Sequence, residues 1–411
     1  MWSVYGPLSF KSIAYTLRQV ISVAFDKASN CGKSKYSRSA VIVLIVTVAM
    51  TAWSGRLIMS SYEVEPIVPG PSVSDIIKLS HYFPGIEGTP GDTNVYFLDS
   101  GNPGGTVLVL GGVHATEVAG MLTGVLLIEN AQVNQGRLIV IPHSNNSGFT
   151  AQPAEDAFVP VFHIQTEWGE RWFRLGDRLT NSVHQWPDPE AYAHYPSGQI
   201  LSGSEVRNLN RCFPGRPDGL FTEKIAYAIT QLIEAEACDL VIDLHEASAM
   251  YPVVNVMVAH DNAIDIAGMA AMTMEFEEGV NIGVEASPVG LRGLSHREIG
   301  DHTRAKVILM ETANPMMDWV RGRTTEDLLL TGQDEFMLKA SKKGLVRVPY
   351  DEQGVPIEER VGRHSSGLQQ ILNTMSLMYP DSAVQVEGVP KYAEIREHGL
   401  GHFLKNPAED I

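Results

Sequence analysis

The sequence contains little cysteine and no excess of basic residues, and both absences limit what the protein can be. Only three of its 411 residues are cysteines, Cys31, Cys212 and Cys238, and none stands in a CxxC or zinc-finger spacing. We therefore expect no disulfide framework, and any bound metal must be held by His and carboxylate side chains. The formal net charge of −17 argues against a nucleic-acid partner, because phosphate contacts require clustered Lys and Arg.

Charge is also missing from a long stretch near the amino terminus. Residues 40–53 contain no charged side chain, whereas residues 1–60 hold seven Lys or Arg and a single acid, Asp26. We interpret residues 1–39 as a basic cytoplasmic leader and residues 40–59 as a signal-anchor transmembrane helix, because positive charge before an apolar run keeps the amino end inside. A bilayer requires roughly 20 apolar residues, so this span includes Arg56, whose side chain must reach the interface.

Two other interpretations of this apolar run remain open. No good small-x-small cleavage site follows it, so we favour an uncleaved anchor over a removed signal peptide. The run could also be a buried core helix of a soluble protein. With the anchor, the protein is expected to be a single-pass membrane protein whose remaining chain lies on the extracytoplasmic (periplasmic) side.

The rest of the chain alternates strand-like and helix-like segments. Residues 60–92 are rich in Pro and Gly and predict a linker. Over residues 93–323, short apolar runs predict strands and helical spacing predicts helices, which together indicate an α/β domain with a largely parallel or mixed sheet. The strands are expected at 94–99, 105–110, 137–141, 239–244, 253–258 and 305–310, and the helices at 117–129 and 220–237.

Two regions depart from this alternation. Residues 150–205 are rich in Trp and Tyr and lack clear periodicity, which is typical either of a functional loop or of an irregular insertion on the domain's flank. Residues 324–411 predict helices at 325–342 and 367–378 joined by polar loops, and we interpret them as a helical carboxy-terminal extension.

Two expected strand ends carry residues suited to a metal. One strand is followed by Gly-Gly-Val-His114-Ala-Thr-Glu117, and another ends in Asp243-Leu-His245. Ligands bind at the carboxyl ends of strands in α/β sheets, and two imidazoles with one carboxylate form the His₂Glu set of a catalytic zinc site. Asp243 points to the same side as His245 and is expected to orient a ligand. Each motif alone would also suit an ordinary buried residue.

Two further segments suit substrate binding and proton transfer. In the loop 207–215, Asn210 and Arg211 are suited to holding a carboxylate, although the loop could also be a solvated turn. Glu311 follows an apolar strand, where a carboxylate needs a partner. It suits a general base beside a metal-bound water. The alternative is an ion pair with Arg292, Arg297 or Arg304.

In this order the segments resemble the succinylglutamate desuccinylase/aspartoacylase family of zinc carboxypeptidase-like hydrolases, over about residues 95–315. The shared motifs are GGVHATE (111–117), Pro-x-x-Asn-x-x-Gly-Phe (142–149), NLNRCFPG (208–215), DLHE (243–246) and LMET (309–312). The resemblance implies a three-layer α/β/α sandwich and one Zn²⁺ per chain. It implies that His114, Glu117 and His245 hold the metal, that Glu311 is the general base, and that Asn210 and Arg211 bind the substrate carboxylate.

Two positions depart from the family pattern. Asn208 stands where the family usually has Asp, and Gly203 stands where it has a second substrate arginine. Arg207 or Arg178 could take that place, and we expect Arg207 to stabilise the oxyanion. The sequence thus predicts a zinc-dependent deacylase acting on an N-acyl amino acid or a small amide with a carboxylate. The alternatives are a membrane-anchored zinc carboxypeptidase acting on envelope peptides and a catalytically silent zinc-binding scaffold.

Overall fold

The computed structural model describes residues 35–153 and 158–409, in two units that divide after Ser60. Most of the predicted basic leader lies outside the described residues. The first unit contains helix α2 (Lys35–Ser60). Its apolar part, Ser39–Ser60, has 22 residues and no buried portion. At about 1.5 Å per residue it is long enough to cross a hydrocarbon core of about 30 Å, although a signal sequence has the same properties.

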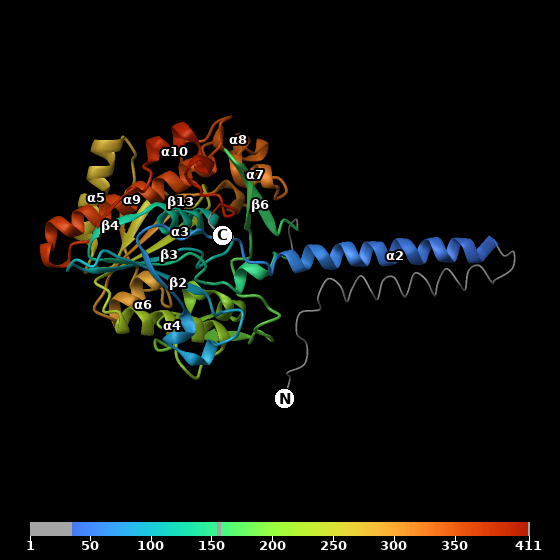
Figure 1. Cartoon of the computed structure of the whole chain (residues 1–411), viewed down its shortest axis with the longest axis horizontal. Helices are drawn as coiled ribbons and strands as arrows, with labels where there is room; N and C mark the ends of the chain where they lie inside the picture. Colours follow the sequence, from blue (N-terminus) through green and yellow to red (C-terminus); the bar gives the residue numbers. More distant parts are fainter. Residues whose placement is uncertain (1–34, 154–157, 410–411) are drawn as a thin grey trace. The chain divides into compact units, whose positions relative to one another are not determined.

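The second unit is built on an eight-stranded sheet (Figure 1). Strands β5, β3, β10 and β13 run parallel to one another, as do β11 and β12, and the remaining three pairings are antiparallel. The predicted mixed, mostly parallel sheet is therefore confirmed. In spatial order the strands are β1 (Val73–Lys78), β2 (Asn94–Asp99), β5 (Arg137–Ile141), β3 (Thr106–Leu110), β10 (Leu240–Ala247), β13 (Lys306–Ala313), β11 (Val256–Ala259) and β12 (Gly283–Ala286).

Helices cover both faces of this sheet, which confirms the predicted sandwich (Figure 1). Because side chains alternate between the two faces along a strand, the same strands contribute to two cores. Leu244 of β10 packs in one core with Leu368 of a carboxy-terminal helix, and Val241 of β10 packs in the other with Ile229. The helices are α3 (Val118–Asn130), α5 (Ile264–Glu278) and α9 (Ile357–Met378) on one face, and α4 (Phe221–Ala235) and α6 (Ser295–His302) on the other.

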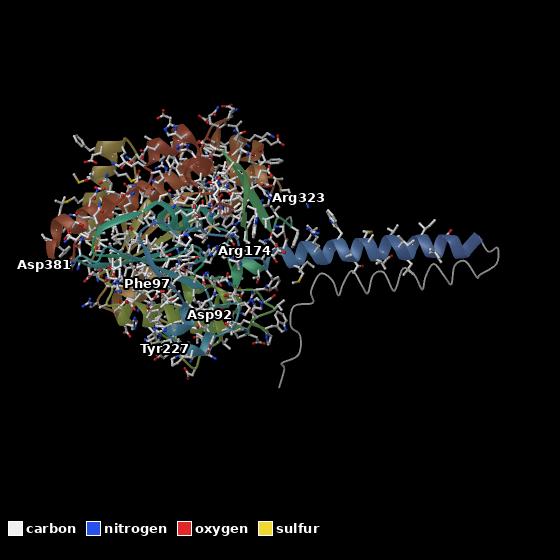
Figure 2. The ribbon with its side chains drawn as sticks, in the orientation of Figure 1. Asp92, Phe97, Arg174, Tyr227, Arg323 and Asp381 are labelled. Carbon is white, nitrogen blue, oxygen red and sulfur yellow. The ribbon has the colours of Figure 1, made fainter. Side chains whose placement is uncertain are left out.

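The segment 60–92, expected to be a linker, is part of the domain. It contains β1 at the edge of the sheet, and the Pro and Gly residues lie in turns around it. Glu65 is buried and accepts a hydrogen bond from Nε of Arg174 at 2.6 Å, and it lies 2.8 Å from Nε2 of His143. Arg174 is labelled in Figure 2. A buried, paired carboxylate fixes the chain at this point, because leaving the charge unpaired would be costly.

The region 324–411 also belongs to the sandwich. The helix expected over 325–342 is interrupted at Gly332, which has a φ of +63°, so it forms α7 (Glu326–Thr331) and α8 (Glu335–Ser341). The second helix, α9, begins ten residues earlier than expected and packs against α3 and α5. The region ends with strand β14 (Gln385–Glu387), which pairs with β4 (Gln132–Gln135), and helix α10 (Tyr392–His398).

The insertion 150–205 forms two hairpins and returns between them to the strand ends. The hairpins are β6 (Val161–Thr166) with β7 (Gly169–Arg174), and β8 (Ala191–Ala193) with β9 (Ile200–Ser202). After β7 the chain runs beside the loop that follows β3, where Ala115 N donates to the carbonyl of Asp177 at 3.2 Å. Gly176 passes so close to this region that a Cβ would lie 2.4 Å from the carbonyl oxygen of Gly148. This close approach brings Arg178 to the end of β3.

Candidate active site

The carboxyl ends of β3 and β10 bring together the three side chains predicted as metal ligands. Nδ1 of His114 lies 2.7 Å from Oε1 of Glu117, and Nδ1 of His245 lies 2.8 Å from Oε2 of the same carboxylate. All three side chains are buried, and one ligand atom from each lies within 4.8 Å of the others. They converge on one point, as the ligands of a zinc ion must.

The opposite nitrogen of each imidazole faces an oxygen acceptor. Nε2 of His114 lies 2.9 Å from Oδ1 of Asn208, and Nε2 of His245 lies 2.9 Å from Oδ2 of Asp243. A neutral imidazole in this setting keeps its proton on Nε2 and offers the lone pair of Nδ1 to a metal. Asn208, which replaces the family's usual Asp, is itself oriented by donating from Nδ2 to Oε2 of Glu205 at 2.8 Å.

Protons and an arginine balance the negative charge of the cluster. Burial raises the pKa of Glu117, but the imidazoles of His114 and His245 lower it well below its usual value. Burial lowers the pKa of His245, but Asp243 and Glu117 raise it well above its usual value. Arg178 donates from one guanidinium nitrogen to Oε1 of Glu117 at 3.0 Å. A divalent cation could replace this positive charge and release a proton, so the donor set fits zinc.

Glu311 lies on β13 directly beside His245 of β10. The two residues are register partners in the parallel pairing, so their side chains leave the sheet on the same face. Burial raises the pKa of Glu311 to about 8, and its Oε2 has no hydrogen-bond partner in the described part of the chain. The sequence suggested an ion pair between Glu311 and Arg292, Arg297 or Arg304. Each of these three arginines instead pairs with a different carboxylate.

Of the two arginines considered for the place of the second substrate arginine, Arg178 reaches the cluster and Arg207 does not. Arg207 makes a bidentate pair with Asp188, at 2.7 and 2.9 Å, and donates to a backbone carbonyl at 2.9 Å. The guanidinium of Arg207 is therefore occupied by contacts with Asp188 and Thr180 of the insertion. Arg178 comes from the insertion and contacts both His114 and Glu117. The structure thus places Arg178, and not Arg207 as expected, at the candidate metal ligands.

Asn210 and Arg211 lie beside the cluster in the short helix η5 (Leu209–Arg211). Oδ1 of Asn210 accepts a hydrogen bond from the backbone N–H of Ser295 at 2.8 Å, so part of this side chain holds the start of α6. The pKa of Arg211 is lowered by burial and by the charge of Arg178. Nε of Arg211 lies 3.6 Å from Oε2 of Glu205, which compensates part of its charge.

Thr116 and Arg178 also line a cavity of about 830 Å³. Its other lining residues include Met316, Trp319 and Arg323, but His114, Glu117, His245 and Glu311 do not line it. The side chain of Trp319 is 99% exposed. Ligand cavities commonly occupy about 300–1,000 Å³, so this one has room for a substrate larger than a single acylated amino acid.

Residues from behind the sheet hold Glu117 in place, and they were not predicted from the sequence. The backbone N–H of Glu246 donates to Oε2 of Glu117 at 3.0 Å. The carboxylate of Glu246 accepts from the N–H of Ala119 at 3.0 Å, at the start of α3, and from Arg360 of α9 at 2.8 Å. The side chains of Glu246 and Arg360 are completely buried. This ion pair therefore links the carboxy-terminal helix to the metal ligands.

His364 of α9 is a second buried group in this region. Neither ring nitrogen has a hydrogen-bond partner among the described residues. Burial lowers its pKa to about 3. The folded protein therefore keeps this histidine neutral at pH values where an ordinary histidine is charged.

We expect His364 to weaken the fold in mild acid. The unfolded chain takes up a proton at this residue below about pH 6.5, whereas the folded chain does so only near pH 3. The unfolded state therefore binds more protons between these values, and stability falls as the pH drops through this window. Melting temperatures of the metal-free protein should fall less in His364→Leu than in the wild type. His81→Leu, at an exposed histidine, is the control. If the melting temperature of His364→Leu falls with pH as steeply as that of the wild type, the interpretation is contradicted.

Comparisons with known proteins bear on the predicted family. Residues 191–303 match the family described as the Succinylglutamate desuccinylase/Aspartoacylase catalytic domain. A stretch of 64 residues is 38% identical to the N-alpha-acetyl-L-2,4-diaminobutyric acid deacetylase of Halomonas elongata, and it covers 16% of this chain and 18% of that protein. The family match includes His245 and the loop with Asn210 and Arg211.

Similar solved structures have low sequence identity to this chain. The ectoine utilization protein EutE of Ruegeria pomeroyi is 22% identical with a TM-score of 0.31, over 54% of this chain and 53% of that one. A metallo-carboxypeptidase of Burkholderia cenocepacia is 11% identical with a TM-score of 0.41, over 79% and 69%. The chain thus spans about half the length of EutE and less than a fifth of the curated deacetylase. The match over residues 191–303 supports the resemblance to the succinylglutamate desuccinylase/aspartoacylase family that the motif order indicates.

Proposed function

We propose that the protein is a zinc-dependent hydrolase that cleaves the amide bond of an N-acyl amino acid or a similar small amide with a free carboxylate. The observation that carries this proposal is the convergence of His114, Glu117 and His245 beside Glu311. Two imidazoles that present Nδ1, one carboxylate and a neighbouring unpaired carboxyl are the parts that metal-assisted hydrolysis needs. The match of residues 191–303 to the succinylglutamate desuccinylase/aspartoacylase catalytic domain supports the deacylase-type reaction.

The reaction follows from the positions of these side chains. Zinc held by His114, Glu117 and His245 would lower the pKa of a water molecule and polarise the scissile carbonyl. Glu311 acts as the general base, because its carboxylate can take the proton of the attacking water and deliver it to the leaving nitrogen. Arg178 stabilises the negative charge that develops on the carbonyl oxygen.

The substrate's free carboxylate would meet Arg211 and Nδ2 of Asn210. The planar guanidinium of Arg211 can donate two parallel hydrogen bonds to a carboxylate. Such a clamp fixes the distance between the carboxylate and the scissile amide, so that the reacting atoms are held in position.

We further propose that α2 anchors the protein in a membrane, with the catalytic domain on the extracytoplasmic side. The helix is long and apolar enough to span a bilayer. Seven Lys or Arg and one acid lie within residues 1–60, and an excess of positive charge marks the cytoplasmic end of a span.

A carboxypeptidase acting on envelope peptides is the second candidate function. The observation that favours it is the cavity of about 830 Å³ with the exposed Trp319 at its edge. A peptide would fill more of this space than an acylated amino acid, and an exposed indole offers apolar contact area. The chemistry at the metal would be the same.

Zinc analysis and a substrate panel test these proposals. The purified full-length protein should contain about one zinc per chain, and His245→Ala should lose most of it, since two ligands rarely hold the ion. His402→Ala, at a partly exposed histidine that pairs with Glu167, is the control and should keep its zinc. Full zinc occupancy in His245→Ala would overturn the proposed site.

The substrate panel then separates the candidate activities. The wild-type protein should hydrolyse acetyl or succinyl amino acids with a higher kcat/KM than peptides. A preference for peptides with a free carboxyl terminus would support the carboxypeptidase. Zinc binding without turnover of either class would mean that the protein is a catalytically silent scaffold.

A further inference from the structure

An apolar surface lies at the point where the catalytic domain begins. Val183 is 79% exposed and Trp186 is 76% exposed, and both belong to the turn 181–186 of the insertion. His184 of the same turn contacts the ring of Tyr62 with a centroid distance of 6.2 Å. Tyr62 is 39% exposed. We refer to Tyr62, Val183 and Trp186 as the entry patch.

The turn places polar side chains inside and apolar side chains outside. Asn181 is buried and donates from Nδ2 to the carbonyl and hydroxyl oxygens of Thr150. Gln185 is also buried, and its amide bonds with Thr222 and with the carbonyl of Val206. These contacts fix the turn, so Val183 and Trp186 cannot rotate into the core. In water this arrangement is the reverse of what the hydrophobic effect favours.

The chain itself limits what can cover the entry patch. The apolar helix ends at Ser60, and Tyr62 is only two residues further on. Two residues reach at most about 7 Å. The headgroup layer on each side of a bilayer is roughly 5–7 Å thick. If α2 spans a bilayer, Tyr62 lies within or next to the headgroups, and its contact with His184 keeps the turn 181–186 near the same level.

We propose that the entry patch docks on the bilayer that α2 spans, with Trp186, Val183 and Tyr62 in the interfacial layer. Trp and Tyr are enriched at this depth because one part of each ring system is apolar and the other can hydrogen-bond. Residues 61–64 and 181–187 contain one acid, Glu63, and no Lys or Arg. The contact is therefore apolar and does not require anionic lipid. It rests on the membrane anchoring proposed above.

Docking would restrict how the catalytic domain moves on its anchor. Arg178 stands three residues before Asn181 in the same segment, and it contacts the candidate metal ligands. A turn held at the lipid surface therefore fixes the orientation of the insertion that supplies Arg178.

Tryptophan quenching by brominated lipid tests the docking. The full-length protein is reconstituted in phosphatidylcholine vesicles with and without brominated acyl chains. The emission of Trp186 is obtained as the difference between the wild type and Trp186→Phe, and that of Trp53, within α2, as the difference from Trp53→Phe. We expect brominated lipid to quench most of the emission of both residues and aqueous iodide to have little effect on either.

A matched control places a tryptophan on another exposed apolar position. Phe276 of α5 is 90% exposed, and Phe276→Trp in the Trp186→Phe background should be quenched by iodide and not by lipid. Val183→Asp should reduce the lipid quenching of Trp186 at least twofold and leave that of Trp53 unchanged.

The outcomes separate docking from anchoring. If Trp53 is quenched by lipid but Trp186 only by iodide, the anchor stands and the docking is refuted. If Trp186 is shielded from both quenchers, a second protein copy covers the patch and the lipid contact is refuted as well. If neither tryptophan is quenched by lipid, the anchoring itself fails. Equal quenching of Trp186 in Val183→Asp and the wild type would also contradict the docking.

Discussion

Glu311→Gln should abolish nearly all turnover while the fold and the zinc content remain. The amide has almost the same shape as the carboxylate but cannot accept the proton of the attacking water. General-base catalysis typically contributes about 10²–10⁴-fold, so kcat/KM should fall by at least about 10²-fold. Because Oε2 of Glu311 has no hydrogen-bond partner in the described residues, the substitution breaks no visible contact at that atom. The melting temperature should therefore change little.

Three measurements on one preparation decide the role of Glu311. They are zinc content, melting temperature and kcat/KM on one substrate. Glu285→Gln, at an exposed glutamate of β12, is the control and should behave like the wild type. An active Glu311→Gln variant with zinc bound and a lower melting temperature would assign the residue a structural role. The base would then have to be sought among other groups.

The pH profile of the wild type should reflect the same carboxyl group. The general base must be ionised, so kcat/KM falls as the pH drops through its pKa. Burial raises this pKa to about 8 in the metal-free site. A bound divalent cation favours the charged form, so the acid limb of the zinc enzyme should lie below pH 8.

The cluster of three candidate metal ligands could be predicted from the sequence because its signals are local. His114 and Glu117 stand three apart after two glycines at a strand end, and His245 lies near the carboxyl end of β10, in which every residue is buried. Glu311 directly follows the apolar run of β13. Parallel strands bring their carboxyl ends to one edge, so strand order alone brings these residues together.

The groups that position the ligands could not be found in this way. Arg178 reaches the cluster because the insertion returns to β3 through the close contact at Gly176. The composition of a loop does not reveal its course. The pattern of Pro and Gly around β1 indicates turns, but it cannot show that Glu65 is buried against Arg174 on a distant hairpin. Such pairs depend on residues far apart in the chain.

The buried position of Arg360 could not be predicted from the sequence either, and it affects the proposed metal site. Its partner Glu246 lies 114 positions earlier in the sequence, and their side chains meet without exposure to solvent. From the sequence alone, an arginine on α9 is predicted to lie at the surface, because arginines are rarely buried unless they are paired. Only the packing of α9 behind the sheet shows that the charge is needed.

Arg360→Met should weaken zinc binding as well as the fold. Removing one partner of a buried ion pair typically costs about 3–5 kcal/mol, because the other charge remains buried. Burial already raises the pKa of Glu246, and Arg360 opposes that effect. Without the arginine, Glu246 should take up a proton, and its contact with Ala119 N–H should weaken. Since the backbone N–H of Glu246 also holds Glu117, the zinc affinity should fall by about 10–100-fold, as for other outer-layer partners of metal ligands.

A double variant separates lost stability from lost positioning. In Arg360→Met with Glu246→Leu no charge remains buried, so the free energy of unfolding of the metal-free protein should recover much of its loss. The zinc affinity should stay low, because the acceptor for Ala119 N–H is absent. Arg363→Met, on the same helix but paired with Glu359 near the surface, is the control and should bind zinc normally. Denaturant unfolding and competition with a chelator measure the two quantities. Wild-type zinc affinity in Arg360→Met would mean that the buried pair stabilises α9 and does not position Glu117.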